Sequence, residues 1–547
     1  MQDEILDCIR SPFFIIYLSI LLSVCTHIGA SASDNVELGF TAYRLQQYDI
    51  NGNQYGSRTS RVTFEAVSLN AETIRKSVLL SWKEMLNRDL TAMFDKGAGA
   101  VIIVIPKDLA DFSEDSEFLK FENVLATIKT DLAVFVTPWQ EELDGLLDDV
   151  KKMSDRTSTA TQQLLNVFAG NTFQLYSAQT ANPVAVDGKQ HFNVIGRLAA
   201  QERGVPTLVF VAHYDSYGPV PALSPGADSN GSGMVALLEL MAVFQRFYSS
   251  SATRPKYNML FIASAAGKFS YQGARQWLED YVEKPTEEKI ELALCLDTIG
   301  NGDVLRMHVA KVPADESPAS KIFKRMESLL VGSGRKVELV SKKINMQKDF
   351  LDWEHERFNI KRLPAVTLSR LSTPADPSRT SMLDTVSRLD LNVLESNIRL
   401  VAEAVLGHVF NLPAAGCTFD AGCSLLGTTA VEPERISAMV AKFASKSRSA
   451  AVIDKVLVSE LRDIMSHYTG GHANLHKVAL SADTVTLYGP EEDKIVAHRV
   501  KPAIFDLFIG MAVMSYLFVL YQFIIHAQAN IERFVGLVSR KASKKTI

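Results

Sequence analysis

The sequence has few cysteines, no strong excess of either charge, and no repeated or low-complexity segment. Five cysteines occur in 547 residues, and 57 basic residues stand against 62 acidic ones, for a formal net charge of −5. The lack of a basic excess argues against nucleic-acid binding, which relies on lysine and arginine neutralising phosphates. The lack of a repeat period argues against a repeat architecture. A chain of this length is too long for one compact core, so two or three domains are expected.

Long hydrophobic runs occur near both ends of the chain. The first, residues 12–25, precedes the small-residue pattern Ala30-Ser31-Ala32, which is typical of a secretory signal peptide spanning residues 1–32. Acidic residues outnumber the single Arg10 ahead of this run, whereas signal peptides usually begin with positive charge. An uncleaved signal anchor is therefore the alternative. Either segment would deliver the bulk of the chain across a membrane.

The second run, Leu507 to Ile525, contains no charged residue. About 20 such residues span a bilayer, so residues 503–526 are predicted to form a transmembrane helix. The tail, 527–547, is rich in lysine and arginine and is expected to be cytosolic, which predicts a type I topology with a large lumenal region. The chain ends in Lys544-Lys545-Thr546-Ile547, a dilysine pattern that retrieves type I proteins to the endoplasmic reticulum.

The region between these runs divides into three parts. We expect an N-terminal lobe at 33–155, an α/β domain at 156–412 and a membrane-proximal α+β region at 413–502. In the α/β domain, short apolar runs alternate with helical segments, which predicts an α/β/α sandwich with a mostly parallel sheet. The strands predicted in it are Thr207–Ala212, Asn258–Ala263, Leu292–Leu296 and Leu363–Leu368.

Several local features of the flanking parts can also be predicted. Residues Ser77 to Phe94 are expected to form a helix in the N-terminal lobe. In the membrane-proximal region, alternating residues on both sides of Gly489-Pro490 predict a β-hairpin. Cys417 and Cys423 lie close together in a loop of a region argued to be lumenal, so we predict a local disulfide between them.

The stretch from Thr207 to Met241 carries the most specific motif. A buried apolar strand is followed by His213-Tyr214-Asp215, then by a proline- and glycine-rich loop. Asn230-Gly231-Ser232 can then start a helix. Side chains directly after a strand of such a sheet lie where α/β proteins keep their sites.

These residues resemble the zinc aminopeptidase-like (M28-type) family. Its members carry H-x-D-S after a strand and G-A-D-D-N-x-S-G before a helix, and this chain has His213-Tyr214-Asp215-Ser216 and residues 226–233 in the same order. The resemblance implies two metal ions held by five protein ligands, with a glutamate as general base. By position, His213 matches the first histidine ligand, Asp228 the bridging aspartate and Asp297 the second aspartate.

The remaining positions depart from the family pattern. The glutamate pair that supplies base and ligand falls on Gly267 and Lys268, and no Asp or Glu occurs from Leu240 through Leu278. The final histidine ligand falls on Thr380, or on Arg379 one residue earlier. Loss of a general base alone costs roughly 10²–10⁴ in rate. We therefore expect no enzymatic activity, no metal and no cofactor.

Two aspartates near each other without a metal need another positive charge. We hypothesise that Lys268 or Arg379 supplies it, because an uncompensated buried carboxylate is costly. The chain also contains one N-x-S/T sequon, at Asn230 in the same loop. Packing is expected to hide that asparagine; the alternative is that loss of substrate access has freed it for glycosylation.

Residues 353–370, together with Lys268-Phe269-Ser270-Tyr271-Gln272-Gly273 and the segment 378–385, resemble the nicastrin-related, catalytically degenerate members of this family. The resemblance covers nearly the whole chain. It implies a complex with the large lumenal protein nodal modulator and a small polytopic membrane protein. That complex acts at the ribosome-bound Sec translocon and helps multi-pass membrane proteins, including receptor and channel subunits, to insert and assemble. The alternatives are an active membrane-bound zinc aminopeptidase and a nicastrin-like substrate receptor of an intramembrane protease.

Overall fold

A computed structural model describes most of the chain. The described residues are 37–69, 74–86, 97–110, 112–154, 172–178, 183–186, 191–283, 289–413, 418–419, 424–427, 430–452, 454–480, 484–500 and 503–543. The predicted signal peptide, Cys417, Cys423 and the dilysine pair Lys544 and Lys545 lie outside these residues.

The larger body is a sandwich built on an eight-stranded mixed sheet. In sheet order its strands are β16 (Lys336–Ser341), β15 (Val304–Val309), β17 (Ala365–Ser369), β14 (Lys289–Leu296), β12 (Pro206–His213), β13 (Asn258–Ser264), β11 (His191–Leu198) and β18 (Ala473–Val478). The four central strands β17, β14, β12 and β13 are mutually parallel. The predicted parallel core of an α/β/α sandwich is confirmed, and each of the four predicted strands is present.

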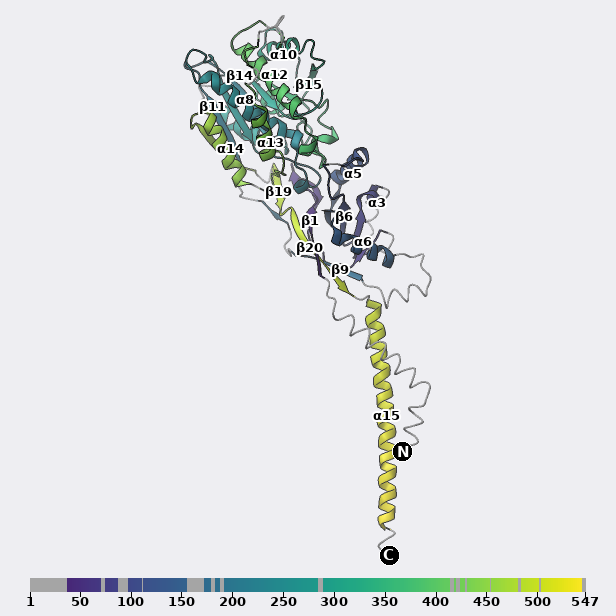
Figure 1. The fold of residues 1–547 in the computed structure, drawn as a ribbon. Helices are drawn as coiled ribbons and strands as arrows, with labels where there is room; N and C mark the ends of the chain where they lie inside the picture. Colours follow the sequence, from purple (N-terminus) through teal and green to yellow (C-terminus); the bar gives the residue numbers. More distant parts are fainter. Residues whose placement is uncertain are drawn as a thin grey trace.

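Helices cover both faces of this sheet, and Figure 1 labels those of one face. One face carries α8 (Gly233–Tyr248), α10 (Pro318–Leu329), α12 (Leu391–Val409), α13 (Pro433–Phe443) and α14 (Lys455–Tyr468), and the other carries α9 (Gln272–Glu283) and α11 (His355–Ile360). Strand β12 shows why helices are needed on both faces of the sheet. Leu208 and Phe210 pack toward the first set of helices, whereas Val209 and Val211 pack toward the second. A strand buried on both faces reads as a continuous apolar run.

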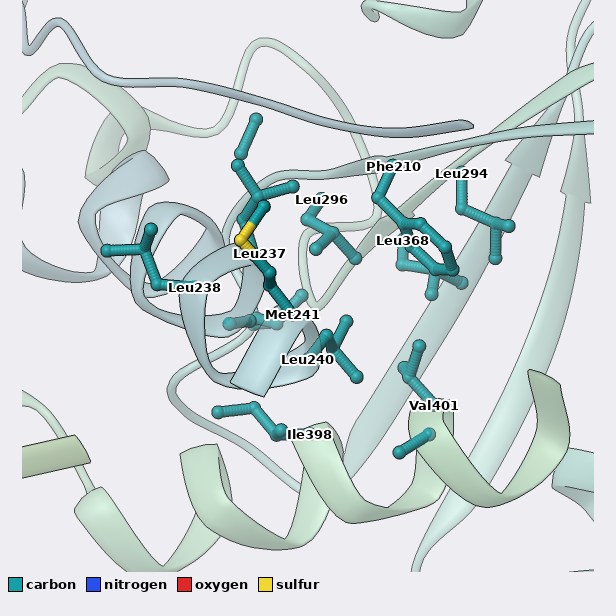
Figure 2. Close-up of a cluster of buried hydrophobic side chains, with 14 of the residues drawn as sticks. Phe210, Leu237, Leu238, Leu240, Met241, Leu294, Leu296, Leu368, Ile398 and Val401 are labelled. Carbon is teal, nitrogen blue, oxygen red and sulfur yellow. The ribbon is translucent and has the colours of Figure 1, made fainter. Parts of the chain in front are cut away.

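Helix α8 is the central element of the first face. Figure 2 shows Leu240 and Met241 of α8 between strand residues such as Phe210 and the α12 residues Ile398 and Val401. Thirteen of its sixteen residues are buried. This burial fixes the start of α8, and with it the loop that carries Asp228.

The second body is a seven-stranded sheet that joins the N-terminal lobe to two strands from later in the chain, β9 (Thr172–Ser177) and β20 (Glu492–Val500). In sheet order its strands are β4 (Ala66–Val67), β5 (Ser77–Ser81), β6 (Ala100–Ile105), β8 (Ala133–Pro138), β1 (Glu37–Arg44), β20 and β9. Helices α3 (Trp82–Leu86) and α5 (Asp115–Thr127) pack on one face and α6 (Glu141–Ser154) on the other. The helix predicted from Ser77 is wrong over its first five residues, which form β5. Val78, Leu79 and Leu80 are all buried in the sheet, and a short apolar run does not by itself distinguish strand from helix.

The predicted hairpin around Gly489-Pro490 is also wrong. Strand β19 (Val485–Gly489) pairs with β2 (Gln47–Ile50) and β10 (Val184–Ala185), in a second sheet that continues through β3 (Asn53–Ser57) to β7 (Lys129–Thr130). Strand β20, by contrast, pairs with β1 and β9 in the seven-stranded sheet. Alternation marks each strand correctly but cannot show that neighbouring strands join different sheets.

Helix α15 (Ala503–Ser543) extends away from both bodies (Figure 1). Residues Asp506–Leu537 are long and apolar enough to cross a membrane, and large apolar side chains such as Phe518 and Phe523 are exposed along it. At 1.5 Å per residue the helix is about 62 Å long, about twice the hydrocarbon thickness of a bilayer. This exposed apolar helix fits a membrane protein.

Candidate functional site

The carboxyl ends of the central strands bring the motif residues together. His213 ends β12, Asp297 follows β14, and Arg370 follows β17. The loop after β13 carries Gly267 and Lys268. Parallel strands end at the same edge of a sheet, which is why residues far apart in sequence meet here.

Asp228 is held in a tight polar cage. Gly226, with a φ of 59°, turns the chain before it, and the carboxylate is 1% exposed. One carboxylate oxygen accepts the backbone N–H of Gly300 at 2.7 Å. The other accepts Arg370 Nε at 2.6 Å and Asn301 Nδ2 at 3.1 Å. The negative charge at this position is therefore paired with Arg370.

Asp297 is paired with a second arginine. Its Oδ2 accepts Arg379 Nη2 at 2.7 Å, and its Oδ1 accepts the Thr298 hydroxyl at 2.8 Å. Burial alone would raise the pKa of Asp297, but the adjacent charges of Arg379 and Lys268 hold it below its ordinary value. The carboxylate is therefore ionised and neutralised by protein groups.

The Arg379 guanidinium is itself held in place. It donates to the Asp352 carbonyl at 2.9 Å and to the Tyr271 hydroxyl at 2.7 Å. It also lies over the Trp353 ring, 4.6 Å from its centroid. These contacts fix the cation that faces Asp297, in agreement with the hypothesis that Arg379 supplies the missing positive charge.

His213 packs against the position where the family has its base. A Cβ at Gly267 would lie 2.2 Å from the Cβ and Cγ atoms of His213, so a glutamate cannot replace this glycine without displacing the ring. His213 Nδ1 lies 3.7 Å from Glu354 Oε2. Burial lowers the pKa of His213 and raises the pKa of Glu354 to about 8, so both groups are mainly neutral near pH 7.

Lys268 does not contact either aspartate of the motif. Its Nζ donates to Ser229 Oγ at 2.6 Å and to the Arg379 carbonyl at 3.2 Å. Burial and the nearby Arg379 lower the pKa of Lys268 to about 8. The backbone of its loop is fixed by Asp215, whose carboxylate accepts the N–H groups of Gly267 at 2.7 Å and Lys268 at 3.0 Å. Of the two cations hypothesised, Arg379 is the one that meets a motif aspartate.

Two residues of this site, Arg370 and Glu354, were not identified from the sequence. Arg370 could have been found, because it is the first residue after a strand of the parallel core. Glu354 is harder to find, because it precedes the short helix α11 and reaches the site only through the packing of that helix. Thr380, at the family's histidine position, ends a 3-10 turn (Pro377–Thr380) and has no carboxylate or imidazole to offer a metal.

The N-terminal lobe forms hydrogen bonds with the residues that directly follow this turn. The Glu122 carboxyl of α5 accepts the Ser381 hydroxyl at 2.6 Å and the Met382 N–H at 2.5 Å. Burial raises the pKa of Glu122 to about 7. The lobe therefore holds the segment that presents Arg379.

The residues present do not fit a two-zinc centre. Catalytic zinc takes about three protein ligands from His, Cys, Asp or Glu and leaves one position open. In the part of the chain that the structure describes, no group of three or more such side chains is placed to hold a metal ion. Asp228 and Asp297 already accept arginines, and His213 is turned toward Glu354. No catalytic step through a metal can be derived from this arrangement.

Asn230, the asparagine of the sequon, is buried, and so is Cys295. Asn230 is 0% exposed and adopts a φ of 72° in the turn before α8. An asparagine in this position is inaccessible in the folded chain. Cys295 is a free, buried thiol inside β14.

Comparison with known proteins places this geometry in a family. The family model described as peptidase family M28 matches residues 193–405. Nicalin from Caenorhabditis elegans is 39% identical over 565 residues, covering 99% of this chain and 100% of that protein. The chain belongs to the nicalin family. The human BOS complex subunit NCLN is 32% identical, with 95% of this chain and 94% of that protein covered.

A solved structure agrees with the fold. The gamma-secretase component nicastrin matches with a TM-score of 0.54 and 10% sequence identity, over 84% of this chain and 99% of that chain. At this identity the likeness concerns the fold alone. The predicted resemblance to nicastrin-related members of the M28 fold is confirmed.

Proposed function

We propose that this nicalin-family chain is a non-catalytic subunit of an endoplasmic reticulum membrane complex. Its relatives from several vertebrates are named BOS complex subunits and match over nearly their whole length. In this proposal its partners are nodal modulator and a small polytopic membrane protein. The complex serves the ribosome-bound Sec translocon and assists multi-pass membrane proteins, including receptor and channel subunits.

The observation that carries the non-catalytic assignment is the pairing of two arginines with the two motif aspartates. Arg370 lies 2.6 Å from Asp228 and Arg379 lies 2.7 Å from Asp297. The side chains of these aspartates are 1% and 4% exposed, so their charges need partners close by. A zinc ion in the same place would have to displace both cations.

The topology is proposed on three grounds. Helix α15 is apolar and exposed, the segment after residue 525 is rich in basic residues, and the chain ends in the dilysine pattern. We infer that the two folded bodies are lumenal and that the end of α15 is cytosolic. The same proposal includes the division of the chain into parts that end at residues 32, 155, 412, 502 and 526. It also includes a disulfide between Cys417 and Cys423.

The test is affinity purification of the intact protein from membranes in mild detergent, with partners identified by mass spectrometry. Recovery of nodal modulator with translocon subunits supports the proposal. Recovery of an intramembrane protease instead would favour a nicastrin-like receptor. A stoichiometric zinc content in the purified protein, with peptide hydrolysis, would favour an active aminopeptidase.

A further inference from the structure

A pocket lies beside the site where arginines pair with Asp228 and Asp297. We propose that this basic pocket binds the carboxylate of an extended peptide segment. It is a cavity of about 350 Å³ between the sandwich and the N-terminal lobe. Its walls include Lys268, Lys342, Lys348, Arg379, Tyr48 and Phe350. The volume lies in the range of pockets that hold small ligands.

The lining has an excess of positive charge. Four cations line the pocket, and Asp352 is the one acid among the described lining residues. Lys342 and Lys348 both contact this carboxylate, at 2.8 Å and 2.7 Å, so a single negative charge is shared by two ammonium groups. The charge of Arg379 is neutralised by Asp297, which is not among the residues that line the pocket. The net charge facing the cavity is therefore positive, and an anion is the complementary ligand.

Lys268 is one of the cations that line the pocket. The partners of its ammonium group, Ser229 Oγ and the Arg379 carbonyl, are both uncharged. A cation in such surroundings gains more from a bound anion than one that is already ion-paired, because charge-assisted hydrogen bonds are the stronger ones. Lys268 is accordingly the residue expected to contact the carboxylate.

The pocket also has aromatic lining residues, which favour a peptide over an inorganic anion. Tyr48 comes from the N-terminal lobe, stacks on Tyr55 with ring centroids 4.9 Å apart, and meets Phe350 edge-on at 6.0 Å. Tyr217 also lines the pocket. These rings offer an apolar surface for side chains next to the bound carboxylate. The pocket therefore combines cationic and aromatic lining residues.

The test uses the intact protein in detergent micelles and an octapeptide of alanine and leucine that carries an uncharged BODIPY dye on its N-terminus. One version keeps the free C-terminus and has no glutamate, and a second has an amidated C-terminus and one glutamate. A third, with an amide and glutamine, has no carboxylate in the peptide. Fluorescence anisotropy gives the affinity of each at low and physiological salt.

Binding of either acidic peptide at least about tenfold tighter than the uncharged one supports the proposal and identifies the source of the carboxylate. The preference should weaken as salt is raised. Lys268→Gln should reduce the affinity about tenfold. Ala375→Trp, at the exposed rim, should block binding without touching the charges, which keeps the test valid if Lys268→Gln does not fold.

The matched control is Lys324→Gln. Lys324 is an ion-paired surface lysine on α10, 3.0 Å from Asp315, and its loss should leave affinity unchanged. Equal binding of all three peptides, no binding of any, or an equal loss in Lys324→Gln would overturn the proposal. The assay does not depend on which complex the chain joins, so it can fail while the proposed function holds, and the reverse is also true.

Discussion

The apolar core beneath β12 and the polar edge where β12 ends differ in how specific their residues must be. The core is made of side chains that any apolar residue of similar size could replace, and Phe210 and Leu240 lie within it (Figure 2). The edge depends on particular charged partners such as Arg370 with Asp228 and Arg379 with Asp297. The fold can therefore persist while the chemistry at the edge changes.

This difference explains how a peptidase-like sheet can hold a site that does not fit zinc. Parallel strands still deliver His213, Asp228 and Asp297 to the same place. Two arginines, from segments that follow β17, now neutralise the aspartates. Neither arginine lies in a strand of the sheet or in one of the helices that cover it.

The largest effect is expected in the core. Phe210→Ala should lower the free energy of unfolding by about 3–5 kcal/mol, because it removes a fully buried ring and leaves a cavity. Denaturant unfolding of the intact protein in detergent measures it. Met346→Ala is the control, since Met346 is 67% exposed and its truncation should cost less than about 0.5 kcal/mol. Similar losses for the two would show that the core assignment is wrong.

At the polar edge, replacing the two arginines should lower the stability by different amounts. Arg379→Met leaves the Asp297 carboxylate buried without its cation and should cost about 3–5 kcal/mol. Arg370→Met should cost less, about 1–2 kcal/mol, because the Arg370 side chain is 26% exposed against 12% for Arg379 and water can partly replace it. Thermal unfolding of both variants decides the order. A larger loss for Arg370→Met would contradict this account.

Restoring the family's glutamate should not restore a metal site. Gly267→Glu places a side chain against the His213 ring and should destabilise the protein by about 1–3 kcal/mol. Zinc content by atomic spectroscopy should not rise. Gly332→Glu serves as control, since no atom lies within 4 Å of a Cβ there, although its positive φ adds some strain. Stoichiometric zinc in Gly267→Glu would refute the steric argument.

The most gradual effect is expected at the junction with the N-terminal lobe, as a change of stability with pH. The pKa of Glu122 is raised by burial to about 7, so the folded state keeps a proton that the unfolded chain loses near pH 4.3. Stability from this group is present at low pH and is lost as pH rises toward 7, by about 1 kcal/mol per pH unit. Glu122→Gln should remove that part of the slope in thermal unfolding between pH 5 and 7. An unchanged slope would show that Glu122 is already ionised in the fold.

Much of the sandwich could be predicted from the sequence, because β12, β13 and β14 are continuous apolar runs. The three retained motif positions could also be placed, since each follows a strand or opens a helix. The split of β19 and β20 between two sheets could not, because pairing partners as distant as Tyr48 and Phe40 leave no local signal. The position of Arg370 after β17 could have been noted, but its pairing with Asp228, 142 residues away, has no local signal.

The most direct test of the central claim is a double-mutant cycle between Arg379 and Asp297, measured by thermal unfolding of the intact protein. If the arginine neutralises the aspartate in place of a metal, Asp297→Asn should recover part of the stability lost in Arg379→Met. The expected coupling energy is about 1–3 kcal/mol. Additive losses from the two substitutions would contradict the claim that these two charges balance each other.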